Sequence, residues 1–129
     1  MLFRSSYIQA ATTYATHDLT AGCGSTASSN DVFFSFTLTQ REMVYADTLG
    51  ATWDTVLFFA SSCTTPIAGS TTPGDAVCND DASTIGCTSS GTASQVSAVL
   101  NPGTYYLVLS GYGGASRSEE RRVGKECRL

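Results

Sequence analysis

Positive charge is nearly absent from most of this chain. The first 116 residues contain eight acids but only two basic residues, Arg4 and Arg41, which gives that stretch a formal charge of −6. Proteins that bind nucleic acids use lysine and arginine to neutralise phosphates and to contact base edges. We therefore expect no nucleic-acid partner.

Long apolar runs are also lacking. No window approaches the roughly 18 apolar residues of a membrane-spanning helix, and the N-terminus offers only the three-residue apolar start "MLF" where a signal peptide needs seven or more. We expect no membrane insertion. The polar residues are mainly serine, threonine and glycine, which is typical of an extracellular β-rich chain. This favours an extracellular or cell-surface location, in a chain that begins within a longer exported protein.

Catalytic motifs are scarce. The chain has one histidine, His17, and no G-x-S-x-G motif, whereas a serine or cysteine nucleophile needs a base beside it. The spacing of the acids does not select a carboxylate pair for glycoside hydrolysis. We expect that the protein is not an enzyme, and a small secreted hydrolase is the remote alternative.

The first 116 residues contain four cysteines, and none is arranged as C-x-x-C. The absence of that spacing favours two disulfides over a zinc site. Four cysteines allow three connectivities, and the sequence does not decide among them. Our first choice pairs Cys63 with Cys78, which flank a loop of 14 residues, and leaves Cys23 to pair with Cys87.

Short β-type segments alternate with turn residues, which predicts one all-β domain over residues 1–116, poorly defined over 1–20. Residues 31–39, "DVFFSFTLT", have one strongly apolar face and predict a half-buried strand. Residues 53–60, "WDTVLFFA", are apolar on both faces and predict a central strand. The runs "SQVSAVL" and "TYYLVLS" flank the turn sequence "NPG" at 101–103, which predicts a hairpin.

An acidic loop is the best candidate for a cofactor site. Asn79, Asp80 and Asp81 are consecutive, and Asp54 or Asp47 at strand ends can complete an oxygen-rich set. Calcium takes six to eight oxygen ligands from carboxylates, amides and carbonyls. The sequence thus suggests a calcium site, with a solvated acidic turn capped by Asx-type hydrogen bonds as the alternative.

The aromatic residues are expected mainly in packing. Trp53, Tyr105 and Tyr106 fall on strand periodicity, which favours side-chain packing over a stacking platform for sugar or peptide. Tyr112 lies in the loop "GYGG" and is the aromatic that we expect to be exposed and available for binding.

Three stretches together resemble the bacterial pre-peptidase C-terminal (PPC) domain family: "DVFFSFTLT", "WDTVLFFASSC" with "VCNDD", and "VLNPGTYYLVLSGYGG". The resemblance covers roughly residues 20 to 115. It implies a jelly-roll-like antiparallel β-sandwich that is appended to secreted or surface proteins and is not itself catalytic; some members bind calcium and an extracellular protein. Where the family continues into a last strand of the form Y-T-L-x-V, this chain reads "ASRSEERRVGKECRL", so the resemblance implies that the last strand is lacking.

The final thirteen residues differ from the rest of the chain. They carry five basic residues and the fifth cysteine, Cys127. Residues 117–128 resemble the translation of a widely used sequencing-library adapter, read as AGA TCG GAA GAG for the first four codons. We interpret residues 117–129 as an artefactual tail and not as a domain.

These observations predict an accessory module that supports or targets a larger exported protein. The expected partners are the covalently linked protein itself and an extracellular protein or polysaccharide. The alternative is a purely structural surface module with no ligand of its own.

Overall fold

The computed structural model describes residues 12, 15–48, 51–67, 76–81 and 92–116. Within them the chain forms seven strands and no helix, and every strand pairing is antiparallel. The strands are β1 (Asp31–Leu38), β2 (Glu42–Asp47), β3 (Thr55–Ser62), β4 (Thr65–Pro66), β5 (Cys78–Asn79), β6 (Gln95–Leu100) and β7 (Gly103–Gly111). The predicted all-β class is confirmed, and the jelly-roll connection stays a prediction. Cys87 and the predicted tail at 117–129 lie outside the described residues.

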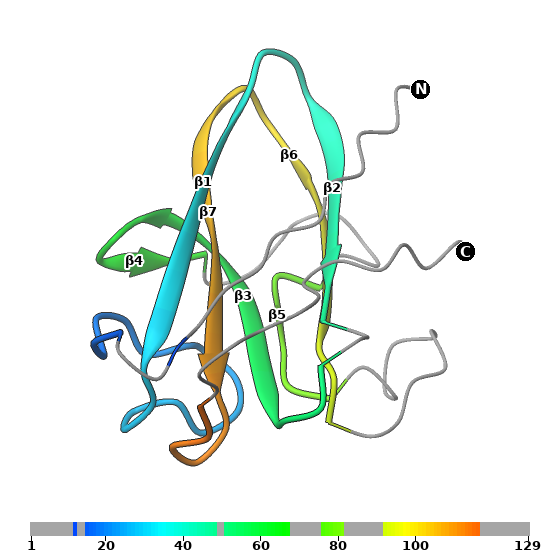
Figure 1. The fold of residues 1–129 in the computed structure, drawn as a ribbon. Helices are drawn as coiled ribbons and strands as arrows, with labels where there is room; N and C mark the ends of the chain where they lie inside the picture. The colour runs from blue at the N-terminus through cyan, green and yellow to red at the C-terminus, as the bar shows by residue number, and fades with distance from the viewer. Residues whose placement is uncertain (1–11, 13–14, 49–50, 68–75, 82–91, 117–129) are drawn as a thin grey trace.

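The strands form two sheets (Figure 1). The larger sheet has the order β1-β7-β3-β4, with β5 also paired to β3, and the smaller one contains β2 and β6. No helix long and apolar enough to cross a membrane is found in the part of the chain described here.

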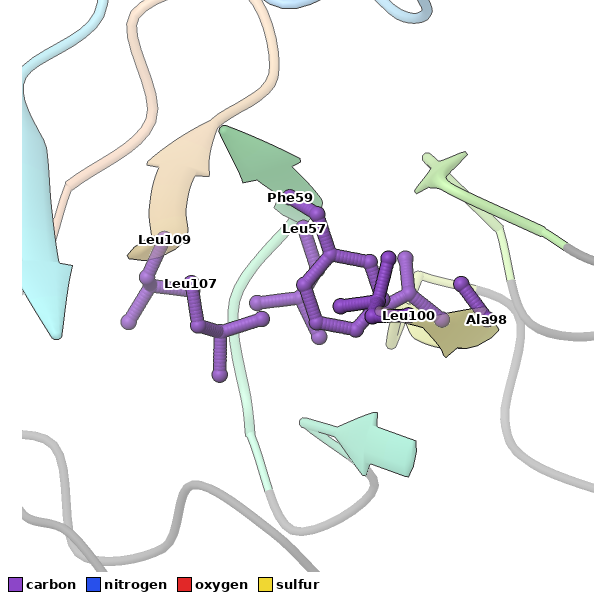
Figure 2. Close-up of a cluster of buried hydrophobic side chains, with 7 residues drawn as sticks. Leu57, Phe59, Ala98, Leu100, Leu107 and Leu109 are labelled. Carbon is purple, nitrogen blue, oxygen red and sulfur yellow. The ribbon is translucent and has the colours of Figure 1, made fainter. Parts of the chain in front are cut away.

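The main core lies between the two sheets. Leu57, Phe59, Leu107 and Leu109 of the larger sheet meet Val96, Ala98 and Leu100 of β6 (Figure 2). Both faces of β3 are apolar because both are buried. Its alternate residues enter two separate clusters, one on each face of the sheet. Phe58 and Ala60 pack with Val108 and Leu19 on the opposite face of the sheet. Residues 55–60 are all buried, so the predicted central strand is confirmed.

Strand β1 is half-buried, as the sequence predicts. Phe34, Phe36 and Leu38 pack against the main core, while Phe33 reaches the second cluster on the other face. The irregular segment before β1 supplies Leu19 and Ala21 to that second cluster.

The predicted hairpin at residues 94–110 is wrong. Strand β6 pairs with β2, and β7 pairs with β1 and β3. The turn at 101–102 therefore carries the chain from one sheet to the other, as do residues 39–41 between β1 and β2; both connections lie at the top of Figure 1. An apolar strand, a tight turn and a second apolar strand fit this crossing as well as a hairpin, because both strands face the core between the sheets.

Candidate cation site

Three carboxylates meet at the end of the sandwich opposite the two sheet crossings. Asp54 directly precedes β3, and Asp80 and Asp81 directly follow β5. Because β5 pairs antiparallel with β3 at Leu57↔Asn79, the start of β3 and the end of β5 are neighbours. One carboxylate oxygen from each aspartate lies within 4.8 Å of those from the other two. We call Asp54, Asp80 and Asp81 the acidic cluster.

Two members of the acidic cluster have buried oxygens that receive no hydrogen bond from the described residues: Oδ1 of Asp54 and Oδ1 of Asp80. Burial raises the pKa of Asp54, and the charge of Asp81 raises it further. For Asp80, burial raises the pKa most, followed by the charges of Asp81 and Asp54. Among the described residues, these two oxygens of Asp54 and Asp80 thus lack a hydrogen-bond donor, a condition that a bound cation relieves.

The acidic cluster has no described lysine or arginine beside it. Arg41 is the single such residue in the described ranges, and it lies between β1 and β2. That crossing adjoins the Leu38↔Gly103 end of the larger sheet, whereas Asp54 adjoins the Thr55↔Gly111 end. The pairing places them at opposite ends of the nine-residue strand β7.

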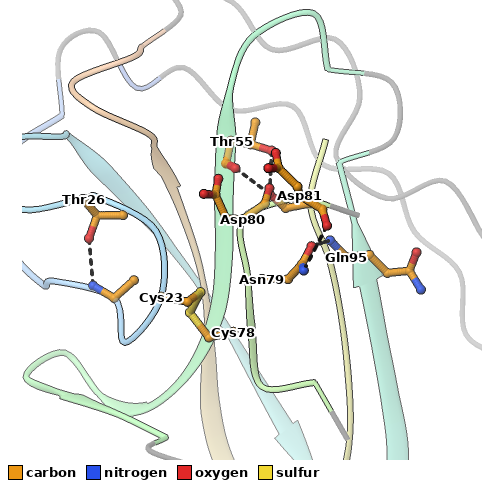
Figure 3. Close-up of a disulfide and its surroundings, with 10 residues drawn as sticks. Cys23, Thr26, Thr55, Cys78, Asn79, Asp80, Asp81 and Gln95 are labelled. Atoms are coloured by element: carbon orange, nitrogen blue, oxygen red, sulfur yellow. Dashed lines mark hydrogen bonds between the residues drawn. A yellow bond between two sulfur atoms is a disulfide. The ribbon is translucent and has the colours of Figure 1, made fainter. Parts of the chain in front are cut away.

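A disulfide holds the segment around Cys23 and Gly24, which lies against Asp80 and which we call the covering loop. Cys23 bonds Cys78 of β5, two residues before Asp80, with a Cα–Cα separation of 6.0 Å (Figure 3). Gly24 follows with φ of +66°, and a Cβ placed there would lie 3.4 Å from Oδ2 of Asp80 and 3.0 Å from a methyl of Val56. The positive φ and the close approach to Val56 favour glycine at residue 24, whose backbone lies next to Asp80.

The predicted pairing of the cysteines is wrong. The expected Cys63–Cys78 bond fails because Cys78 pairs with Phe58 of β3, whereas Cys63 comes five residues later, directly after that strand. Five residues of strand span on the order of 15 Å, well beyond the about 7 Å that a disulfide tolerates between Cα atoms. Cys63 is exposed and free. The expected Cys23–Cys87 bond is also wrong, because Cys23 is bonded to Cys78.

Two of the five predicted ligands lie outside the acidic cluster. Oδ1 of Asn79 accepts a hydrogen bond from the backbone N–H of Gln95 at 3.0 Å, and its Nδ2 donates to the carbonyl of Asp81 at 3.3 Å. Asn79 thus connects the end of β5 and the following Asp81 to β6. Asp47 is fully buried at the end of β2, opposite Gln95. Among the described residues, the acidic cluster does not include it.

Tyr112 lies beside the acidic cluster, and its exposure is confirmed. Its residue is 44% exposed, and its backbone N–H donates to the carbonyl of Asp54 at 3.1 Å. The strand aromatics pack as predicted: Tyr105 stacks on Phe36, and Tyr106 makes an edge contact with Phe33. Tyr112 is thus an exposed aromatic residue whose backbone adjoins the start of β3, where Asp54 lies.

His17 takes part in fastening the segment before β1. Its Nδ1 lies 2.7 Å from the carbonyl of Ser29 and 3.7 Å from the buried carboxylate of Asp31, while its Nε2 lies 3.2 Å from the Thr20 hydroxyl. Asp31 itself accepts backbone N–H groups from Asp18 and Leu19. The hydroxyl, the imidazole and the carboxylate lie in a row, but the nearest partner of Nδ1 is a carbonyl and Asp31 is occupied by the backbone. The arrangement is that of a structural anchor, which the sequence pattern did not reveal.

The sequence also did not identify a group of buried hydroxyls beneath the acidic cluster: Thr48, Thr55 and Ser94. The sequence does mark Thr48 and Thr55, because each directly follows an aspartate in an Asp-Thr pair, and this pair occurs twice in the chain. Nothing in the sequence around Ser94 marks it.

Comparisons with protein-family models, with curated proteins and with solved structures found no match to this chain.

Proposed function

We propose that this chain is a non-catalytic accessory module of an exported bacterial protein, and that its acidic cluster binds a calcium ion. The ion stabilises one end of the β-sandwich and the surface beside it, which contacts an extracellular protein or polysaccharide. The disulfide is compatible with this location. The likeness of three sequence stretches to the PPC family supports the same role, and the antiparallel two-sheet arrangement agrees with the fold expected from that likeness.

One observation carries the cation proposal: two buried carboxylate oxygens, on Asp54 and Asp80, without a hydrogen-bond donor among the described residues. Leaving such groups unpaired is costly. A cation that binds both oxygens, together with Asp81, removes that cost and the repulsion among three like charges.

The ligand types favour calcium over other metals. The set contains carboxylate oxygens and no described histidine or free thiol, which suits a hard cation and not zinc. Calcium–oxygen bonds are about 2.3–2.6 Å long, so oxygens on opposite sides of the ion are about 5 Å apart. The oxygens of the cluster all lie within 4.8 Å of one another, a spacing that one calcium coordination sphere spans.

The test is calorimetric titration of the full chain with calcium chloride, together with thermal unfolding in calcium and in EDTA. At calcium concentrations 100-fold above Kd, binding stabilises the fold by about 2.7 kcal/mol, an increase in Tm of about 10 °C for a chain of this size. Asp80→Asn should remove most of this increase. Asp18→Asn, which changes an exposed carboxylate outside the cluster, should leave it intact. Absence of both binding heat and a Tm shift in the unaltered chain would exclude the calcium site.

Targeting is tested separately, by retention of the chain on collagen, gelatin and insoluble polysaccharides. We expect retention on one of them in calcium and loss of that retention in Tyr112→Ala, because Tyr112 is the exposed aromatic next to the cluster. Absence of retention on all of them, with calcium binding intact, would favour the alternative of a purely structural module.

A further inference from the structure

Three buried hydroxyl groups form a chain of hydrogen bonds under the acidic cluster. Thr48, Thr55 and Ser94 are at most 1% exposed. The Oγ1 atoms of Thr48 and Thr55 lie 2.7 Å apart, and Oγ1 of Thr55 lies 2.9 Å from Oγ of Ser94. The backbone N–H of Ser94 donates to Oγ1 of Thr48 at 2.8 Å, which closes the group into a ring of contacts.

Counting hydrogens fixes the direction of this chain. Oγ of Ser94 lies 2.7 Å from the carbonyl of Asp80 and 2.5 Å from the carbonyl of Thr55, and carbonyls only accept. The single hydroxyl hydrogen of Ser94 is therefore used on these carbonyls, so Ser94 accepts from Thr55. Thr55 in turn accepts from Thr48, which receives the backbone N–H of Ser94. Each hydroxyl both donates and accepts, an arrangement in which neighbouring hydrogen bonds strengthen one another.

Ser94 lies where the two ligand-bearing segments meet. It contacts the backbone of Asp80 directly, and it contacts the backbone of Thr55, the residue that follows Asp54. The next residue, Gln95, holds Asn79 through its N–H group, and Asn79 holds the carbonyl of Asp81. The start of β6 is thereby joined to the backbone on both sides of the acidic cluster.

We propose that Ser94 and Thr55, through this chain of buried hydroxyls, are positioning residues that hold Asp54 and Asp80 at the spacing a divalent cation requires. The inference rests on the proposed calcium site and adds how that site is kept assembled. Three carboxylates at this distance repel one another when no cation is present, and the loop that carries Asp80 would relax outward without its attachment to β6. The free energy needed to bring this loop back into place would then reduce the free energy of calcium binding.

The test compares calcium Kd values, measured calorimetrically on the full chain well below the Tm of each variant. Loss of groups that orient metal ligands typically lowers metal affinity 10- to 100-fold, so Ser94→Ala and Thr55→Val should raise Kd by about that factor. Thr55→Ser keeps the hydroxyl and should bind calcium within about threefold of the unaltered chain. Ser110→Ala is the matched control, because Ser110 is also fully buried but donates to the carbonyl of Asn30.

Several outcomes would overturn the inference. Unchanged Kd values in folded Ser94→Ala and Thr55→Val would do so, as would an equal loss of affinity in Ser110→Ala, which would indicate a general effect of weakened packing. If Ser94→Ala does not fold, the comparison of Thr55→Val with Thr55→Ser decides. If the unaltered chain binds no calcium, the proposed function fails together with this inference, whereas unchanged variants of a calcium-binding chain refute the inference alone.

Discussion

The Cys23–Cys78 disulfide should be the largest single contributor to stability outside the core. It joins residues separated by 55 positions, and in the chain-entropy description a crosslink of that length removes about 4 kcal/mol of freedom from the unfolded state at 25 °C. Domains of this kind are stable by about 5–15 kcal/mol in total. Replacing both cysteines with alanine should therefore remove a large fraction of the free energy of unfolding and lower Tm by about 15 °C.

The assay is equilibrium unfolding in guanidinium chloride for the unaltered chain, for Cys23→Ala/Cys78→Ala and for Cys63→Ala. Cys63 is exposed and free, so its replacement should change the free energy of unfolding by less than about 0.5 kcal/mol. A loss in Cys63→Ala as large as that in the double variant would refute the assigned pairing. A loss below about 1 kcal/mol in the double variant would refute the entropic calculation.

Three further predictions concern the core, the covering loop and the acidic cluster. Phe59→Ala, at a fully buried position between the sheets, should lower the free energy of unfolding by about 3–5 kcal/mol in a denaturant titration. Gly24→Ala should cost about 1–3 kcal/mol, because φ is +66° and the new methyl would lie 3.0 Å from a valine methyl of β3; Gly22→Ala, with open space around it, is the control and should be near neutral. The pKa values of Asp54 and Asp80 are raised above 3.8, so the folded chain binds protons more tightly there than the unfolded chain does. Without calcium, their contribution to stability should grow as pH falls through the raised pKa values toward 3.8 and shrink as pH rises. Calcium favours the ionised carboxylates and should reverse that trend in urea titrations over the same interval, whereas an identical pH dependence with and without the ion would contradict the assignment.

Local pattern was sufficient to predict the longer strands but not their partners, and it did not predict the two-residue strand β4. The apolar residues on both faces of 55–60 predict a central strand, because burial on two sides requires them. The local sequence of the turn at 101–102 is compatible both with a hairpin within one sheet and with a crossing from one sheet to the other. Only the partners of β6 and β7, which lie far away in sequence, distinguish the two cases.

The acidic cluster was predicted in part for the same reason. Asp54, Asp80 and Asp81 were identified because carboxylates in turns at strand ends tend to be available as ligands. Asn79 and Asp47 have the same chemistry, but the register of β5 and β2 directs Asn79 to the backbone of Gln95 and buries Asp47 opposite that residue. The cysteine pairing depends equally on register, since the alignment of Cys78 with Phe58 separates it from Cys63.

The position of β7 has a consequence for how the protein is made. This strand lies between β1 and β3 and pairs with both, yet it is the last of the described strands to leave the ribosome. At a translation rate of about 5–20 residues per second, β7 is synthesised several seconds after β3, its main pairing partner. During that time the apolar faces of β1 and β3 are exposed with unpaired edges, the condition that favours aggregation of nascent chains. A chain stalled before Gly103 can complete neither the larger sheet nor the core, so assembly of the fold is deferred until translation has passed residue 111.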